Sequence, residues 1–132
     1  MIDLQLLRQD PDLVRASQRA RGDEESVVDA VLDLDARRRA ALTAFGQLRA
    51  EQKRVGQDVA RAQGEHKQVV LARAKELAAE VKAREAEAAR LAAELDEAVL
   101  GIGNVVVAGV PAGGEDDYVV LRTVGTPRDL AA

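Results

Sequence analysis

The sequence predicts an all-α protein, a long antiparallel two-helix coiled-coil hairpin with a short N-terminal helical segment at its base and a short extended C-terminal tail. Two observations carry this prediction. Apolar residues recur in steps that alternate between four and three over two long runs, which is the heptad spacing of a coiled-coil seam. A single pairing register also aligns both runs, layer by layer, when the chain folds back at the short break between them.

The two arm helices are predicted at about residues 26–62 and 67–102, with the tip of the hairpin at residues 63–66. Gly64 in this tip suits the left-handed backbone that a tight turn between helices often needs. The seam residues of the first helix are Val27, Val31, Leu34, Arg38, Ala41, Phe45, Leu48, Gln52, Val55, Val59 and Ala62, and those of the second are Val70, Ala74, Leu77, Val81, Arg84, Ala88, Leu91, Leu95, Ala98 and Ile102. In the shared register Val59 meets Val70 at the tip, and Val27 meets Ile102 at the base.

The segments outside the arm form its base and a connector. Residues 1–9 are expected to form either a helical turn or a strand, and Asp10-Pro11 is a helix start, because Asp caps and Pro opens a helix well. Gly22 is expected to end this base helix, so the base covers about residues 1–22. Residues 1–104 are therefore one arm domain, and residues 105–132 are an extended connector with a short strand from Tyr118 to Val124, which needs a partner from elsewhere.

Composition excludes several classes of function. The chain has no cysteine and a single histidine, which excludes disulfides, thiolate metal sites and the common histidine-based zinc sites. No arrangement of a nucleophile with a general base is present, so we expect no catalytic, cofactor-binding or metal-binding residues and no enzymatic activity in this chain alone. Neither a secretory signal nor an apolar run of about 20 residues is present. We therefore expect a cytoplasmic protein without a membrane partner.

Charge is distributed unequally around the arm, although the net charge is −4. We call the b and e heptad positions of both helices the basic side, and the c and g positions the mixed side. The basic side carries Arg39, Arg49, Lys53, Lys75 and Lys82. The mixed side is net acidic, and its Arg54 and Arg61 lie toward the tip. The basic side is either a stripe that contacts RNA phosphates or a solvated helical face.

The order of several short motifs resembles the N-terminal domain of bacterial seryl-tRNA synthetases. These motifs are MIDLQLLR at residues 1–8, DPDLVR at 10–15, the helical hairpin, VPAGGEDDY at 110–118 and VGTP at 124–127. The resemblance implies an arm that grips the long variable arm and elbow of a serine tRNA. It also implies that a catalytic domain missing from this chain performs serylation, binds ATP and magnesium, and forms a homodimer. One departure is Gly103, which stands where the family usually has proline.

The resemblance favours the RNA interpretation of the basic side. The predicted RNA-binding residues are Arg39, Arg49, Lys53, Lys75 and Lys82, with Arg54 and Arg61 as second candidates. Two alternatives stay open. The chain is a structural or protein-interaction hairpin without an RNA role, or it is a stand-alone paralogue of the arm domain.

Overall fold

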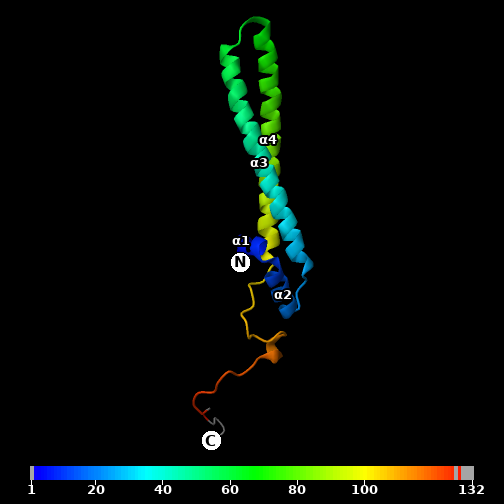
Figure 1. The fold of residues 1–132 in the computed structure, drawn as a ribbon, viewed down its shortest axis with the longest axis vertical. Helices are drawn as coiled ribbons and strands as arrows, with labels where there is room; N and C mark the ends of the chain where they lie inside the picture. The colour runs from blue at the N-terminus through cyan, green and yellow to red at the C-terminus, as the bar shows by residue number, and fades with distance from the viewer. Residues whose placement is uncertain (1, 127, 129–132) are drawn as a thin grey trace.

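The computed structural model describes residues 2–126 and 128, and it shows a long, thin rod (Figure 1). Its elements are α1 (Leu4–Gln9), α2 (Pro11–Arg21), α3 (Ser26–Arg61), α4 (Gly64–Leu100) and a single 3-10 turn, η1 (Glu115–Asp117). Helices α3 and α4 run antiparallel and pack against each other over about 54 Å, the length of 36 residues at 1.5 Å each. The predicted all-α hairpin is confirmed. Within the described residues, no helix is both long enough and apolar enough to cross a bilayer.

The predicted seam forms the contact between α3 and α4. Every predicted seam residue is buried or half-buried except Arg84, whose side chain is exposed. Two clusters confirm the register toward the base: Leu34 and Leu95 lie in one, and Ala41 and Ala88 lie in the next. Seam residues beyond Leu77 toward the tip are only half-buried, because small alanine and valine side chains fill little volume there.

The tip is shorter than predicted. Helix α3 ends at Arg61, and α4 already begins at Gly64, whose φ of 59° is left-handed as expected. Only Ala62 and Gln63, both extended, join the helices. These two extended residues and the left-handed Gly64 together reverse the chain, so residues 65–66 already belong to the first turn of α4.

Helix α2 of the base begins and ends where its capping residues predict. The Asp10 side chain accepts a hydrogen bond from the Leu13 N–H at 3.1 Å, and Pro11 opens α2. Gly22 ends α2 with a φ of 79°, a value that favours glycine. Residues 4–9, for which helix and strand both stayed open, are helical. Asp3 caps this helix, because its side chain accepts the Gln5 N–H.

Helix α1 lies on the basic side of the arm at its base. Val28 and Val99 occupy e positions beside the seam, yet both are buried, in one cluster with Ile2 and Leu7 of the N-terminal segment. Val14 brings α2 into the same cluster. Burying an apolar side chain of this size stabilises a fold by about 1.5–3 kcal/mol, so the base is the best-packed part of the molecule.

The start of the connector is bonded to α2. The Gly103 N–H donates to Gln18 Oε1 at 3.2 Å, the Val106 N–H to Ser17 Oγ at 3.1 Å, and the Gly113 N–H to the Ala20 carbonyl at 3.0 Å. Ser17 and Gln18 are buried, so these bonds are part of the base. A proline at position 103 has no N–H and could not make the first of them.

The prediction of a strand from Tyr118 to Val124 is wrong. Residues 118–124 are exposed and belong to no strand or helix, because no neighbouring strand in the described part of the chain supplies hydrogen bonds. The acidic stretch before them forms η1. Met1, Pro127 and residues 129–132 of the predicted base and connector lie outside the described residues.

Candidate nucleic-acid interface

On the mixed side, several arginines are bound to carboxylates within the arm, whereas Arg54 and Arg61 are not among them. Arg73 of α4 joins both helices, because its Nη2 donates to Glu51 Oε1 of α3 at 3.0 Å and its Nη1 donates to Glu80 Oε1 at 3.2 Å. Its pKa is raised, first by the hydrogen bond to Glu51 and also by the charge of Glu80. These contacts leave Arg73 little capacity for an external anion.

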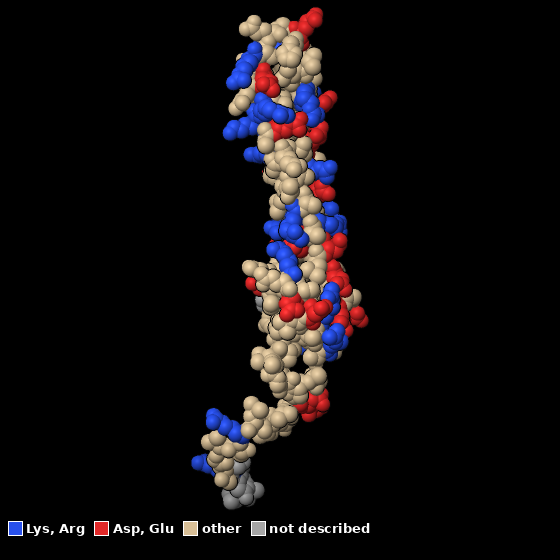
Figure 2. All heavy atoms as spheres, viewed as in Figure 1, with Lys and Arg blue, Asp and Glu red and all other residues tan. Residues whose placement is uncertain are grey.

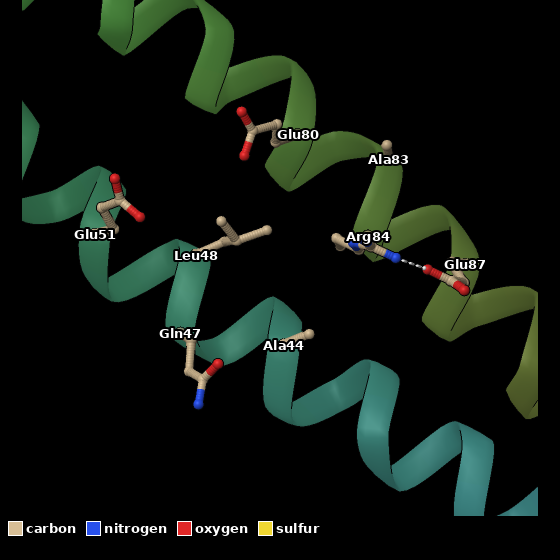
Figure 3. Close-up of a pocket in the computed structure, with 8 residues that line it drawn as sticks. All are labelled: Ala44, Gln47, Leu48, Glu51, Glu80, Ala83, Arg84 and Glu87. Atoms are coloured by element: carbon tan, nitrogen blue, oxygen red, sulfur yellow. Dashed lines mark hydrogen bonds and ion pairs between the residues drawn. The ribbon is translucent and has the colours of Figure 1, made fainter.

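The side chain of Arg84 points out of the seam and lies on the mixed side. Its Nη1 donates to Glu87 at 2.7 Å, and it lines a shallow groove of about 590 Å³ between the helices (Figure 3). In that view Glu51 and Glu80 point toward the gap from opposite helices, and Leu48 of α3 also extends into it. The Phe45 ring, which the register places opposite Arg84, is instead covered by the Arg49 guanidinium at 5.7 Å from the ring centroid. Two further arginines of this side are paired with carboxylates, Arg37 with Asp33 and Arg90 with Glu94.

On the basic side, four of the predicted cations have no such partner. Within the described residues, Arg49, Lys53, Lys75 and Lys82 have no carboxylate within 4.0 Å, and all four are exposed. Lys53 comes from α3 and Lys75 from α4, and the confirmed register places them side by side. Figure 2 shows basic side chains along the whole arm, with carboxylates among them both near the tip and along the right edge of its lower half. The two sides therefore differ in net charge, and a larger share of the cations on the basic side is unpaired.

Arg39, also on the basic side, is partly engaged. Its Nε donates to Asp35 Oδ2 at 3.0 Å, while its side chain remains 56% exposed. Asp35 is 1% exposed and also receives a two-point bond from Arg8 of α1, with Arg8 Nε and Nη2 each at 2.8 Å from its oxygens. These hydrogen bonds, the one from Arg8 first, lower the pKa of Asp35 and keep its carboxylate charged.

The second candidates for RNA binding, Arg54 and Arg61, do not lie on the basic side. Arg54 and Arg61 are exposed on the mixed side and, within the described residues, have no carboxylate within 4.0 Å. Arg61 lines a hollow of about 270 Å³ at the tip, together with Asp58 and His66. The structure thus separates these two arginines from the stripe on the basic side.

Arg8 is the residue that sequence reasoning missed. It precedes the arm by many residues, and its place on the basic side depends on where α1 packs. Two residues could have indicated this packing. Val28 and Val99 are apolar at e positions, which are outside the seam and need a cover if they are to be buried.

Comparison with known proteins identifies the family. The sequence model of one protein family, the seryl-tRNA synthetase N-terminal domain, matches residues 1–106. The chain belongs to this family. Among curated relatives, the serine–tRNA ligase of Thermobifida fusca is 59% identical over 130 residues, covering 98% of this chain and 31% of the relative. That of Kocuria rhizophila is 56% identical over 132 residues, covering 100% of this chain and 30% of the relative.

Solved structures agree with this assignment. The seryl-tRNA synthetase of Pyrococcus horikoshii complexed with ATP aligns with a TM-score of 0.80 at 29% identity, over 89% of this chain and 27% of that chain. The cytoplasmic serine–tRNA ligase of Naegleria fowleri in complex with AMP aligns with a TM-score of 0.75 at 27% identity, over 97% and 29%. The seryl-tRNA synthetase N-terminal domain described here thus spans about 30% of the length of its curated relatives.

Proposed function

We propose that this domain is the tRNA-binding arm of a seryl-tRNA synthetase and that it grips the long variable arm and elbow of a serine tRNA. Family membership supports this proposal, and one structural observation carries it. The basic side presents cations from both helices that no carboxylate of the described chain neutralises. Phosphate groups are the partners that such a surface attracts.

The contacts are proposed to be with the RNA backbone. Structured RNA is recognised mostly through phosphates, 2′-hydroxyl groups and shape, and a rigid rod with a stripe of Lys and Arg suits that mode. Lys53, Lys75 and Lys82 supply flexible point charges, while Arg49 is held over the Phe45 ring. Arg39 extends the stripe toward the base, and Arg54 and Arg61 are proposed as additional contacts near the tip.

The chemistry of serylation is proposed to lie in the part of the synthetase outside this chain. That part would bind ATP and magnesium, form the homodimer and carry the catalytic residues, while the present chain positions the tRNA. In the described residues, no group of three or more His, Cys, Asp or Glu side chains could hold a metal ion. A cytoplasmic location is part of the same proposal.

The test is a binding titration of the 132-residue chain with two RNAs, a serine tRNA with its long variable arm and the same tRNA with that arm shortened. We expect weaker binding of the shortened tRNA and a decrease in affinity for both with rising salt. Equal affinities would contradict recognition of the variable arm. If neither tRNA binds, the alternative of a structural or protein-interaction hairpin is favoured.

A further inference from the structure

Three charged groups from two separate segments meet on the basic side at the base of the arm. Arg8 comes from α1, and Asp35 and Arg39 lie one turn apart on α3. Asp35 Oδ2 accepts from Arg8 Nε at 2.8 Å and from Arg39 Nε at 3.0 Å. Because one oxygen atom binds both groups, the two guanidinium groups are neighbours.

The carboxylate is buried, but the two guanidinium groups reach solvent. Asp35 is 1% exposed, whereas the side chains of Arg8 and Arg39 are 40% and 56% exposed. Arg8 uses Nε and Nη2 for Asp35, and Arg39 uses only Nε. Arg8 Nη1 and both Nη atoms of Arg39 have no partner within the described part of the chain. The cluster carries one net positive charge, and Asp3, the other carboxylate close to Arg8, is bonded to the Gln5 N–H.

We propose that Arg8 and Arg39 form an anion site that binds a backbone phosphate of the RNA, and that Asp35 is its positioning residue. Guanidinium groups match phosphate geometry with two parallel N–H donors, and a group already held in place loses less entropy when it binds. The buried Asp35 carboxylate accepts hydrogen bonds from both guanidinium groups and so fixes their positions, while their remaining N–H groups stay available to a ligand. Figure 1 places α1 beside the base of the arm, and Figure 2 shows, in the same view, basic side chains on the surface just above that level.

The site lies on the same side of the arm as the outer lysines. Asp35 and Arg39 occupy e and b positions, as do Arg49, Lys53, Lys75 and Lys82. A single RNA backbone along this side would therefore meet flexible lysines in the outer arm and a fixed arginine pair at the base. This inference rests on the proposed function, because it adds a contact to the same RNA interface.

The test compares variants of the 132-residue chain for binding to the serine tRNA over a series of salt concentrations. We expect Arg39→Gln to lower affinity several-fold and to reduce the slope of log affinity against log salt by about 0.7–0.9, the value of one phosphate contact. Arg37→Gln is the matched control: it removes the same charge from the same helix, but Arg37 lies on the mixed side and pairs with Asp33 at 3.6 Å. This control is expected to bind like wild type.

Two further variants separate positioning from charge alone. Asp35→Asn makes the chain more positive, so a purely electrostatic role predicts tighter binding, whereas loss of positioning predicts weaker binding. Arg39→Lys keeps the charge and the Arg8–Asp35 pair but loses the two parallel donors of the guanidinium, so we expect it to bind more weakly than wild type while keeping the salt dependence. Circular dichroism at the titration temperature checks folding, and Arg39→Lys decides the question if Asp35→Asn does not fold.

The outcomes distinguish this site from the interface as a whole. If the wild-type chain does not bind the tRNA, the proposed function fails. If it binds but Arg39→Gln matches Arg37→Gln, or Arg39→Lys matches wild type, or a folded Asp35→Asn binds more tightly, the anion site is overturned and the rest of the interface stands.

Discussion

The two sides of the arm use the same kinds of residue for different purposes. On the mixed side, Arg73 joins α3 to α4 through Glu51 and Glu80, so its charge is used within the protein. On the basic side, Lys53 and Lys75 occur on the same two helices and have no carboxylate within 4.0 Å in the described chain. This difference in charge pairing shows that the count of basic residues on a helix does not identify a binding surface. What matters is how many of those charges remain unpaired.

The strongest way to break this comparison is to reverse charge on each side in turn. Lys53→Glu with Lys75→Glu is expected to weaken binding to a serine tRNA on the order of 100-fold at about 0.1 M salt, because two phosphate contacts become repulsive. The matched control is Arg37→Glu with Arg90→Glu, one residue per helix on the mixed side. We expect that control to lose far less affinity, as measured by filter binding or fluorescence anisotropy.

Helix content is measured on both double variants by circular dichroism. All four substituted positions are exposed, so neither variant should lose helix. If the Lys53/Lys75 variant unfolds, those lysines are structural. If both double variants lose affinity equally, the two sides of the arm do not differ in function.

A second prediction concerns Asp35, the one carboxylate paired with arginines on the basic side in the described residues. Its pKa is lowered in the folded protein, first by the hydrogen bond from Arg8, whereas the unfolded chain titrates near about 3.9. The resulting stabilisation is fully present above the unfolded pKa and is lost as pH falls through the folded pKa. Asp35→Asn is therefore expected to reduce the free energy of unfolding by about 2 kcal/mol at pH 7.

The pH dependence is the sharper part of this prediction. The difference in melting temperature between wild type and Asp35→Asn should shrink as the pH falls from about 5 to about 2, because acid protonates the wild-type carboxylate. Thermal melts followed by circular dichroism measure it. A difference that stays constant over this range would show that the substitution acts through packing and not through the charge of Asp35.

The smallest expected effect is at Arg84, where the seam is interrupted. Arg84→Leu should return an apolar side chain to the seam opposite Phe45 and raise the free energy of unfolding by about 1 kcal/mol. Because Arg84 lies on the mixed side and pairs with Glu87, tRNA affinity should stay within about twofold of wild type. A large loss of affinity would show that the mixed side also contacts RNA. Arg84→Gln, which removes only the charge, is the control for stability.

The heptad pattern was sufficient to predict most of the arm because it depends on local spacing. Val31, Leu34 and Ala41 face the residues that the register assigns, and Gly64 reverses the chain as its position in the break indicated. The strand from Tyr118 to Val124 could not be predicted in the same way. Its residues favour a strand, but a strand forms only beside a neighbour, and the described chain provides none.

The candidate site was only partly predictable for a related reason. The heptad assigned Lys53 and Lys75 to one side of the arm and Arg73 to the other, and it could count the acids near each. It could not show that Arg49 covers Phe45, that Arg84 leaves the seam, or that Arg39 binds Asp35. Those outcomes depend on side-chain positions within a turn of helix and on the neighbouring chain.

The amino-acid pattern alone determined the hairpin, its register and its two unequal sides, because helix propensity, caps and heptad spacing act between residues close in the chain. Only the tertiary structure decided which cations remain unpaired and that α1 packs on the basic side. Packing of α1 buries Val28 and Val99 and brings Arg8 to Asp35, which lies 27 residues away in the sequence. Contacts over such separations follow from burial and charge pairing in three dimensions, and no local periodicity encodes them.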